Sequence, residues 1–212
     1  MAILVHHLEN SRSHRVLWLL EELDVPYELK RYQRNPATRL APPVLRQVHP
    51  LGKSPVIEDE GRVVAETGAI VEYLIDRSGG RLGAPANPEG ALCYRYFSHY
   101  AEGSLMPPLL TKLVLGRVPL FGKFVQRRFQ PMIDVHLDYV EAELGKRPWF
   151  AGGEFTAADI MMSYPMEAAR ERAGLGPARH PHSVAWLKKI QERPAYRAAV
   201  ERGGPYAFAQ QR

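Results

Sequence analysis

The first third of the chain switches repeatedly between the alternating pattern of strands and the three-to-four-residue spacing of helices. Val16, Leu19 and Leu20, for example, fall on one helix face, and Pro26 ends that helix. The order of strand, helix, strand, helix, strand, strand, helix predicts a mixed α/β unit. Strands are expected at 3–7, 27–32, 55–59 and 62–65, and helices at about 12–23, 42–48 and 67–77.

A segment rich in glycine and proline, SGGRLGAPANPEG, follows and is typical of a linker. Beyond it the long segments carry helical periodicity, and we expect breaks at glycines and at proline pairs such as Pro107 and Pro108. The second unit is therefore predicted to be an all-helical bundle. We divide the chain into an α/β domain at 1–78, a linker at 79–90 and an all-α domain at 91–212.

Composition narrows the class of protein. At 212 residues, with 45 % apolar and 24 % charged residues, the chain matches an ordinary globular protein. It has no apolar run near the roughly 18 residues of a membrane span and no signal peptide, so we expect a cytoplasmic protein without a membrane partner. Cys93 is the only cysteine, which excludes an internal disulfide and a thiolate metal cluster. The net charge of +5 is scattered along the chain, so we expect no nucleic-acid partner.

The turn between the first strand and the first helix is unusually polar. Asn10, Ser11, Arg12 and Ser13 bring an amide, two hydroxyls and a cation to a helix N-terminus, where anions bind. The turn therefore has two interpretations, simple turn chemistry or an anion site. Histidines lie beside it, but adjacent strand residues point to opposite faces and no third ligand has suitable spacing, so we expect no metal.

Four local motifs follow one another along the chain: NSRSHRVLWLLEEL, HPLGKSPVI, ETGAIVEYL and FTAADI. In the last motif, Thr156 and Asp159 have the spacing of a helix capping box. Taken together, the motifs resemble the cytosolic glutathione S-transferase family over essentially the whole chain. The opening phrase is most similar to the bacterial and fungal branch, which begins with an SRS.R turn. The resemblance implies a thioredoxin-like N-terminal domain followed by an all-helical bundle, with glutathione as co-substrate and no other cofactor.

The motif AETG has the chemistry that the glutamyl end of glutathione requires. This end carries a carboxylate and an ammonium group, so its site needs an anion cradle beside an acid. Thr67 can offer its N–H and hydroxyl at a helix N-terminus, and Glu66 can take the ammonium. The resemblance implies the same two roles, while the simpler interpretation is that both residues only begin the helix.

Further glutathione contacts come from the resemblance. In GKSPV it implies a cis bond before Pro55 and a backbone pairing between Ser54 and the cysteinyl part of glutathione. Lys53 would lie near a ligand carboxylate, although an exposed lysine beside a turn explains it nearly as well. Arg12 in the first helical turn opposes the helix dipole, which suggests an anionic neighbour, either the ligand or a protein acid.

The polar turn can supply what a thiolate needs. Lowering a thiol pKa from about 8.5 by two units requires about 2.7 kcal/mol of preferential stabilisation of the anion. A helix N-terminus provides roughly 0.3 to 1 kcal/mol, and a hydrogen bond to a charged acceptor adds roughly 1.5 to 3 kcal/mol. The related enzymes use tyrosine, serine or cysteine here, and the register is ambiguous by one residue. We favour Ser11 as the donor and keep Asn10 as a close alternative.

The predicted function is a glutathione transferase that activates the glutathione thiolate for conjugation to a small hydrophobic electrophile, with a role in detoxification. Two alternatives are a glutathione-dependent disulfide reductase and a non-catalytic interaction module of the same fold. The absence of cysteine from the turn disfavours the reductase. The resemblance also implies a homodimer. Candidates for the electrophile pocket are Tyr100, Met106, Leu110 and Phe208, each of which is individually better explained as bundle core.

Overall fold

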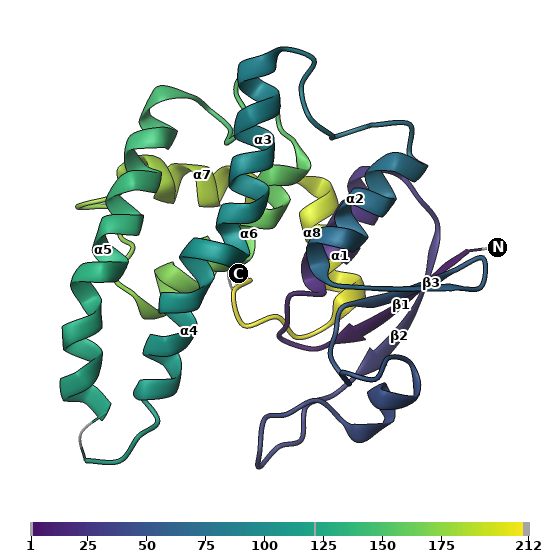
Figure 1. Ribbon diagram of the computed structural model, residues 1–212, viewed down its shortest axis with the longest axis horizontal. Coiled ribbons are helices and arrows are strands. Elements are labelled where there is room, and N and C mark those ends of the chain that lie inside the picture. Colours follow the sequence, from purple (N-terminus) through teal and green to yellow (C-terminus); the bar gives the residue numbers. More distant parts are fainter. Residues whose placement is uncertain (1, 121, 210–212) are drawn as a thin grey trace. The chain divides into compact units, whose positions relative to one another are not determined.

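Figure 1 shows the computed structural model of the chain, which describes residues 2–120 and 122–209. The chain forms two compact units. The first combines the residues up to Gly83 with those from Gln191 onward, and the second runs from Ala84 to Ile190. The boundary between the units at Gly83 and Ala84 falls inside the segment interpreted as a linker.

A mixed four-stranded sheet forms the centre of the first unit (Figure 1). Its strand order is β2-β1-β3-β4, with β1 and β2 parallel and the other neighbours antiparallel. This topology, with helices after β1 and β4, is that of a thioredoxin-like domain. The strands are β1 (Ile3–Leu8), β2 (Tyr27–Tyr32), β3 (Val56–Asp59) and β4 (Arg62–Ala65); the helices are α1 (His14–Glu22), the 3₁₀ helix η1 (Pro43–Gln47), α2 (Thr67–Arg77) and α8 (Pro194–Gly203).

Helix α1 is the core of this unit. Every residue from His14 to Leu20 is buried, and α1 packs against both α2 and α8. The contact with α8 is close at Gly203, where an added Cβ would lie 3.0 Å from Leu17 Cδ1 and 3.3 Å from His7 Nε2. Glycine at this position therefore lets α8 approach both the helix and strand β1.

The second unit is helical among the residues described. Helix α6 runs through its core and is buried along most of its length. At its start the Asp159 carboxylate accepts a hydrogen bond from Thr156 N at 3.0 Å, which confirms the predicted capping box. The elements are α3 (Pro88–Tyr100), the π-helical turn η2 (Ala101–Leu105), α4 (Met106–Leu115), α5 (Gly122–Lys146), α6 (Ala157–Arg172) and α7 (Pro181–Gln191).

The strands and helices up to α2 agree with the prediction to within two residues at each end. The break expected at Pro107 and Pro108 is wrong, because α3, η2 and α4 follow one another without interruption. Both prolines occupy the first turn of α4, where a missing N–H costs little, and the wide turn η2 precedes them. Helix α1 begins at His14, so Arg12 precedes the helix and does not lie in its first turn.

The last part of the chain packs with the first unit. Residues from Gln191 onward cluster with the sheet and α1, whereas the sequence-based division kept 91–212 together. Arg193 forms an ion pair with Glu22 of α1 at 2.5 Å, and Ala207 N donates to Asn10 Oδ1 at 2.6 Å. These contacts join residues far apart in sequence, so helical periodicity alone could not reveal them. No helix in the described ranges is long and apolar enough to cross a membrane.

Candidate functional site

The turn between β1 and α1 is held by a small hydrogen-bond network. Ser11 Oγ lies 2.7 Å from Ser13 Oγ and accepts a hydrogen bond from Ser13 N at 3.2 Å. Ser13 Oγ lies 2.8 Å from His7 Nδ1 and 3.2 Å from the carbonyl oxygen of Leu8. Ser11, Ser13 and His7 are all buried, so the turn is a fixed part of the core and not a loose connection.

Asn10 has a structural role in the same turn. Its backbone has a φ of 50°, in the left-handed region that asparagine tolerates better than most residues. Its side-chain oxygen accepts from Ala207 N, and its backbone oxygen accepts from Arg34 Nη2 at 3.2 Å. The amide oxygen of Asn10 is thus used to hold the C-terminal segment, which leaves Ser11 as the better candidate for a ligand contact.

The loop before β3 lies against the end of β1. The Ser54–Pro55 bond is cis, as the resemblance implied. Ser54 Oγ donates to the carbonyl oxygen of His6 at 2.8 Å and accepts from Leu8 N at 3.1 Å. The ladder between β1 and β3 begins at Val56, so the Ser54 backbone lies just beyond its end. Lys53, next to it, is exposed.

The N-terminus of α2 brings a third segment to this region. Glu66 is exposed and has a φ of 73° and a ψ of 124°, a conformation that a residue with a side chain rarely adopts. Such backbone strain costs of order 1 to 3 kcal/mol and is concentrated at functional sites. Thr67 is buried, and its Oγ1 accepts from Arg15 Nη2 at 3.5 Å.

Three segments therefore meet at the end of β1. The backbone of Leu8 contacts Ser54 Oγ through its N–H and Ser13 Oγ through its carbonyl oxygen. Arg15, buried in the first turn of α1, connects this turn to Thr67 at the start of α2. The structure thus brings the polar turn, the cis-proline loop and the α2 N-terminus together within the first unit. Arg12 lies partly buried beside them, just before α1.

Three residues that the structure places at this site were not assigned a role there by the sequence analysis. His7 and Ser13 form the inner part of the network around Ser11, and Arg15 lies behind Thr67. A long cationic side chain directly before the apolar residues of the first helix was the available signal for Arg15. The pairing of His7 with Ser13 depends on the angle at which α1 leaves the sheet, which the sequence pattern does not specify.

Burial keeps the two histidines of this region neutral. Burial lowers the pKa of His7 to about 4, although a hydrogen bond to the Gly203 backbone opposes this, and Arg31 lowers it further. His14 is fully buried, stacked on Tyr206 with ring centroids 4.1 Å apart. Burial lowers its pKa to about 3, with smaller effects from His7 and Arg15.

The residues predicted for an electrophile pocket belong to different units. Tyr100 and Met106 are buried in the second unit, where the Tyr100 hydroxyl lies 2.6 Å from His136 Nδ1. Leu110 on α4 is 45 % exposed. Phe208 is buried in the first unit and packs against Tyr206. Tyr100 and Met106 thus lie in the core of the bundle, as the simpler interpretation had it, whereas Phe208 is buried in the first unit and not in the bundle.

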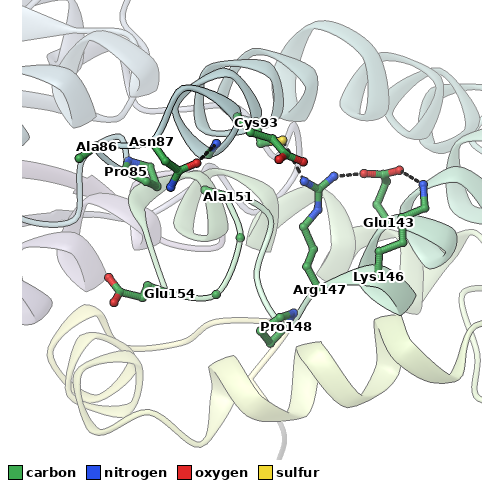
Figure 2. Close-up of a pocket in the computed structure, with 14 residues that line it drawn as sticks. Pro85, Ala86, Asn87, Cys93, Glu143, Lys146, Arg147, Pro148, Ala151 and Glu154 are labelled. Atoms are coloured by element: carbon green, nitrogen blue, oxygen red, sulfur yellow. Dashed lines mark hydrogen bonds and ion pairs between the residues drawn. The ribbon is translucent and has the colours of Figure 1, made fainter.

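Figure 2 shows a cavity of about 1050 Å³ in the second unit, at the start of α3 and the end of α5. Its wall contains Cys93, whose Sγ accepts a hydrogen bond from Arg147 Nη1 at 2.9 Å. Glu143 pairs with Arg147 and, at 2.7 Å, with Lys146. None of the predicted site residues lines this cavity, and the charges in its wall are largely paired with each other, so we keep the first unit as the candidate site.

Comparisons with protein families match both units. The profile described as "Glutathione S-transferase, N-terminal domain" matches residues 2–76, and that described as "Glutathione S-transferase, C-terminal domain" matches residues 117–194. "Glutathione S-transferase 3" of Schizosaccharomyces pombe is 37 % identical over 94 % of this chain and 87 % of that protein. "Glutathione S-transferase 1" of Saccharomyces cerevisiae is 34 % identical over 94 % of each chain.

Solved structures give the same result for the fold. A glutathione S-transferase from Actinobacillus pleuropneumoniae is similar with a TM-score of 0.86 and 32 % identity, over 99 % of this chain and 97 % of that chain. A glutathione transferase homologue from Sulfitobacter, solved with bound glutathione, has a TM-score of 0.80 at 20 % identity, over 95 % of this chain and 98 % of that chain. At that identity the second similarity concerns the fold alone.

The neutral His14 predicts a pH-dependent stability. Its pKa is about 3 in the folded chain and near 6.5 when unfolded, so below about pH 6.5 the unfolded state binds more protons. The free energy of unfolding should therefore fall as the pH drops, by up to about 1.4 kcal/mol per pH unit for this one group. His14→Phe keeps an aromatic ring against Tyr206 and removes the titration.

Urea unfolding of both proteins between about pH 7.5 and about pH 5.5 measures the difference. Comparing slopes with the variant isolates His14 from His7, which acts in the same direction, and from Asp159, whose pKa burial raises to about 6 and which acts in the opposite direction. Equal slopes in the two proteins would contradict the assignment of a neutral, buried His14.

Proposed function

The chain belongs to the glutathione S-transferase family and is a glutathione transferase, and we propose that Ser11 is the residue that stabilises the thiolate of its bound glutathione. In this proposal the ligand lies where the β1–α1 turn, the cis-proline loop and the N-terminus of α2 meet. The observation that carries it is the convergence of these three segments on the end of β1.

The glutamyl end of glutathione binds at the start of α2. Its carboxylate accepts hydrogen bonds from the N-terminal N–H groups of α2 and from the Thr67 hydroxyl. The cationic Arg15 lies directly behind that hydroxyl. The exposed carboxylate of Glu66 takes the ammonium group. The strained backbone of Glu66 supports a binding role, because a residue that only began the helix would have no reason to adopt a φ of 73°.

The cysteinyl part of glutathione pairs with the backbone of Ser54 as an added strand. The side chain of Ser54 holds the loop onto β1, and its backbone lies next to Val56, where the ladder with β1 begins. Pro55 fixes this loop through its cis bond, and Lys53 and Arg12 lie near the remaining carboxylate of the ligand. In this proposal the ligand forms main-chain hydrogen bonds with the segment just before β3, as an added strand does.

Ser11 supplies the hydrogen bond to the sulfur. A shift of two pKa units requires about 2.7 kcal/mol, and one bond to a charged acceptor contributes roughly 1.5 to 3 kcal/mol. The Ser11 hydroxyl is fixed by Ser13 N, so it loses little conformational freedom when the ligand arrives. Asn10 remains the alternative donor through its amide nitrogen, since its oxygen is used by Ala207.

The second substrate in this proposal is a small hydrophobic electrophile. Conjugation is favoured over disulfide reduction because the turn offers a hydroxyl and an amide where a reductase of this family would use a cysteine. A thiol substrate that must stay reduced also fits the expected cytoplasmic location.

We further propose a homodimer. The second unit exposes large apolar side chains on α3, α4 and α5 that a monomer would leave in water. They include Leu92, Tyr96, Val114, Phe124, Met132 and Val135. The first unit exposes Leu40, Val44 and Leu51. In the family, the first unit of one chain pairs with the helical unit of the other.

Two substitutions should separate thiolate stabilisation from binding. Ser11→Ala should raise the pKa of the bound thiol by roughly one to two units and leave glutathione affinity nearly unchanged. Glu66→Gln should weaken binding more than it shifts this pKa, because it removes the partner of the ammonium group. Thiolate absorbance of the binary complex, titrated with pH, measures the first effect, and calorimetry measures the second.

Asn10→Ala is the matched control for Ser11→Ala. A pKa shift only in the Asn10 variant would assign the role to that residue. If neither variant shifts the pKa, the helix dipole and Arg12 alone stabilise the thiolate. The polar side chains of the turn then serve only to form the connection between β1 and α1.

The reaction itself can be assigned by steady-state kinetics with two co-substrates. We expect turnover of chlorodinitrobenzene to exceed that of hydroxyethyl disulfide, because the turn lacks a cysteine that could form a mixed disulfide. Ser11→Ala should reduce turnover of chlorodinitrobenzene most strongly at low pH, where the thiolate fraction limits the rate. Preferential turnover of the disulfide would favour the reductase alternative.

The oligomeric state can be measured by light scattering. We expect about twice the chain mass at micromolar concentration, since a stable interface of usual size buries about 800 Å² on each partner. Val135→Glu places a charge on the exposed apolar face of α5 and should shift the equilibrium toward monomer. A monomer at micromolar concentration in the unaltered protein would refute the dimer.

A further inference from the structure

A buried chain of hydrogen bonds runs inward from Ser11. Ser11 Oγ lies 2.7 Å from Ser13 Oγ, which lies 2.8 Å from His7 Nδ1. On the other side of the imidazole, Nε2 lies beside Gly203 of α8, whose backbone carbonyl accepts a hydrogen bond from the ring. Each hydroxyl in this chain has one proton, so the direction of one bond determines the direction of the next.

His7 sets that direction. Its pKa of about 4 makes it neutral near pH 7, so the ring carries one proton, and the Gly203 carbonyl holds that proton on Nε2. Nδ1 is then an acceptor, so both acceptors of the single Ser13 proton, Nδ1 at 2.8 Å and the Leu8 carbonyl oxygen at 3.2 Å, direct it away from Ser11. Ser13 Oγ has no further proton to give and accepts that of Ser11. In the protein without ligand, the hydroxyl of Ser11 therefore points toward Ser13.

The orientation of the Ser11 hydroxyl affects the bound ligand. The following inference rests on the proposed role of Ser11. We propose that Ser13 and His7 are positioning residues that compete with the glutathione sulfur for the single hydroxyl proton of Ser11. When the thiolate forms, Ser11 turns its proton from Ser13 to the sulfur. The thiolate is thus stabilised by less than a free serine hydroxyl would provide.

The same chain could instead carry the thiol proton to His7, but the surroundings of the ring oppose a positive charge there. Burial and Arg31 on β2 both lower the pKa of the ring, and the hydrogen bond to the Gly203 backbone on α8 opposes them only in part. With a pKa of about 4, only about one molecule in 1000 carries a protonated His7 at pH 7. The chain of hydrogen bonds therefore acts by orienting the hydroxyl of Ser11, and it does not take up the thiol proton.

A weaker hydrogen bond to the sulfur has a benefit for the reaction. The intrinsic nucleophilicity of a thiolate falls as its pKa falls, with a Brønsted coefficient of about 0.4 to 0.5. A serine that stabilised the sulfur more strongly would increase the thiolate fraction and make each thiolate less reactive. The competition by Ser13 keeps the pKa of the bound thiol low enough to form thiolate and high enough for that thiolate to stay nucleophilic.

Ser13→Ala tests the competition, because it removes the acceptor and leaves Ser11 in place. We expect the pKa of the bound thiol to fall by about 0.7 unit, which corresponds to the roughly 1 kcal/mol of one neutral hydrogen bond. This shift is opposite in sign to that expected for Ser11→Ala. Ser13→Thr keeps the hydroxyl and should restore the original pKa. The probe is glutathione, with S-methylglutathione as the blank that cannot ionise.

The pH profile of kcat/KM with chlorodinitrobenzene gives an independent readout. Below the pKa of the thiol, Ser13→Ala should be about 2-fold faster, because more thiolate is present. Above it the variant should be about 2-fold slower, because each thiolate is less nucleophilic. The two profiles should therefore cross, which a general loss of structure cannot produce.

The variant His7→Phe distinguishes a role of His7 in orienting the hydroxyls from a role in accepting the thiol proton. We expect the pKa of the bound thiol to fall by less than in Ser13→Ala, because the Leu8 carbonyl, 3.2 Å from Ser13 Oγ, can still take the Ser13 proton. If His7 accepted the thiol proton, the same variant would raise this pKa. A rise in His7→Phe, or a pKa unchanged or raised in Ser13→Ala, would overturn the proposal.

The unaltered protein provides a test that does not depend on folding of the variants. Nitrogen-15 NMR of the His7 ring should show a proton on Nε2 and none on Nδ1, and a proton on Nδ1 would overturn the proposal. Failure of the proposed function looks different. In that case S-methylglutathione would not shift the melting temperature, or Ser11→Ala would leave the thiol pKa unchanged, whatever the state of His7.

Discussion

The burial of α1 on both of its sides is the constraint on which the first unit depends. The helix packs against both α2 and α8, and its residues from His14 to Leu20 are shielded from water. A buried helix N-terminus leaves N–H groups without water, and each such group is costly unless it finds a partner. At the start of α1 the carbonyl oxygens of Ser11, Arg12 and Ser13 accept hydrogen bonds from the first N–H groups of the helix, and Ser11 Oγ accepts one from Ser13 N.

The same constraint produces a place for an anion. A turn that is buried on its inner side and fixed by Ser13 N and the Leu8 carbonyl can present a hydroxyl at its outer side with little loss of freedom. Arg15 has a comparable effect at α2, since it brings a buried cation behind Thr67. The groups that stabilise the fold at this point are therefore the same groups that form the proposed ligand site, and structural and binding roles cannot be separated by location alone.

Much of the first unit could be predicted from the sequence because its elements are short and their patterns are local. Strand and helix periods gave the order of elements, and the hairpin at Glu60 and Gly61 follows from turn chemistry. The continuous path through Pro107 could not be predicted, because a proline in the first turn of a helix and a proline that breaks one look alike in sequence. The return of the chain after Gln191 depends on contacts between distant residues, which periodicity does not contain.

That return explains why the first and last parts of the chain share one network. Gly203 can approach strand β1 only because it has no side chain, and its carbonyl then faces the ring of His7. Ala207, a few residues later, holds the side-chain oxygen of Asn10, which leaves only the amide nitrogen of Asn10 as an alternative donor to Ser11. Tyr206 between them covers His14 at the start of α1. The last helix and the segment after it thus hold residues in and beside the polar turn, and under the proposed role of Ser11 a substitution in this segment would act on the chemistry of the turn from outside it.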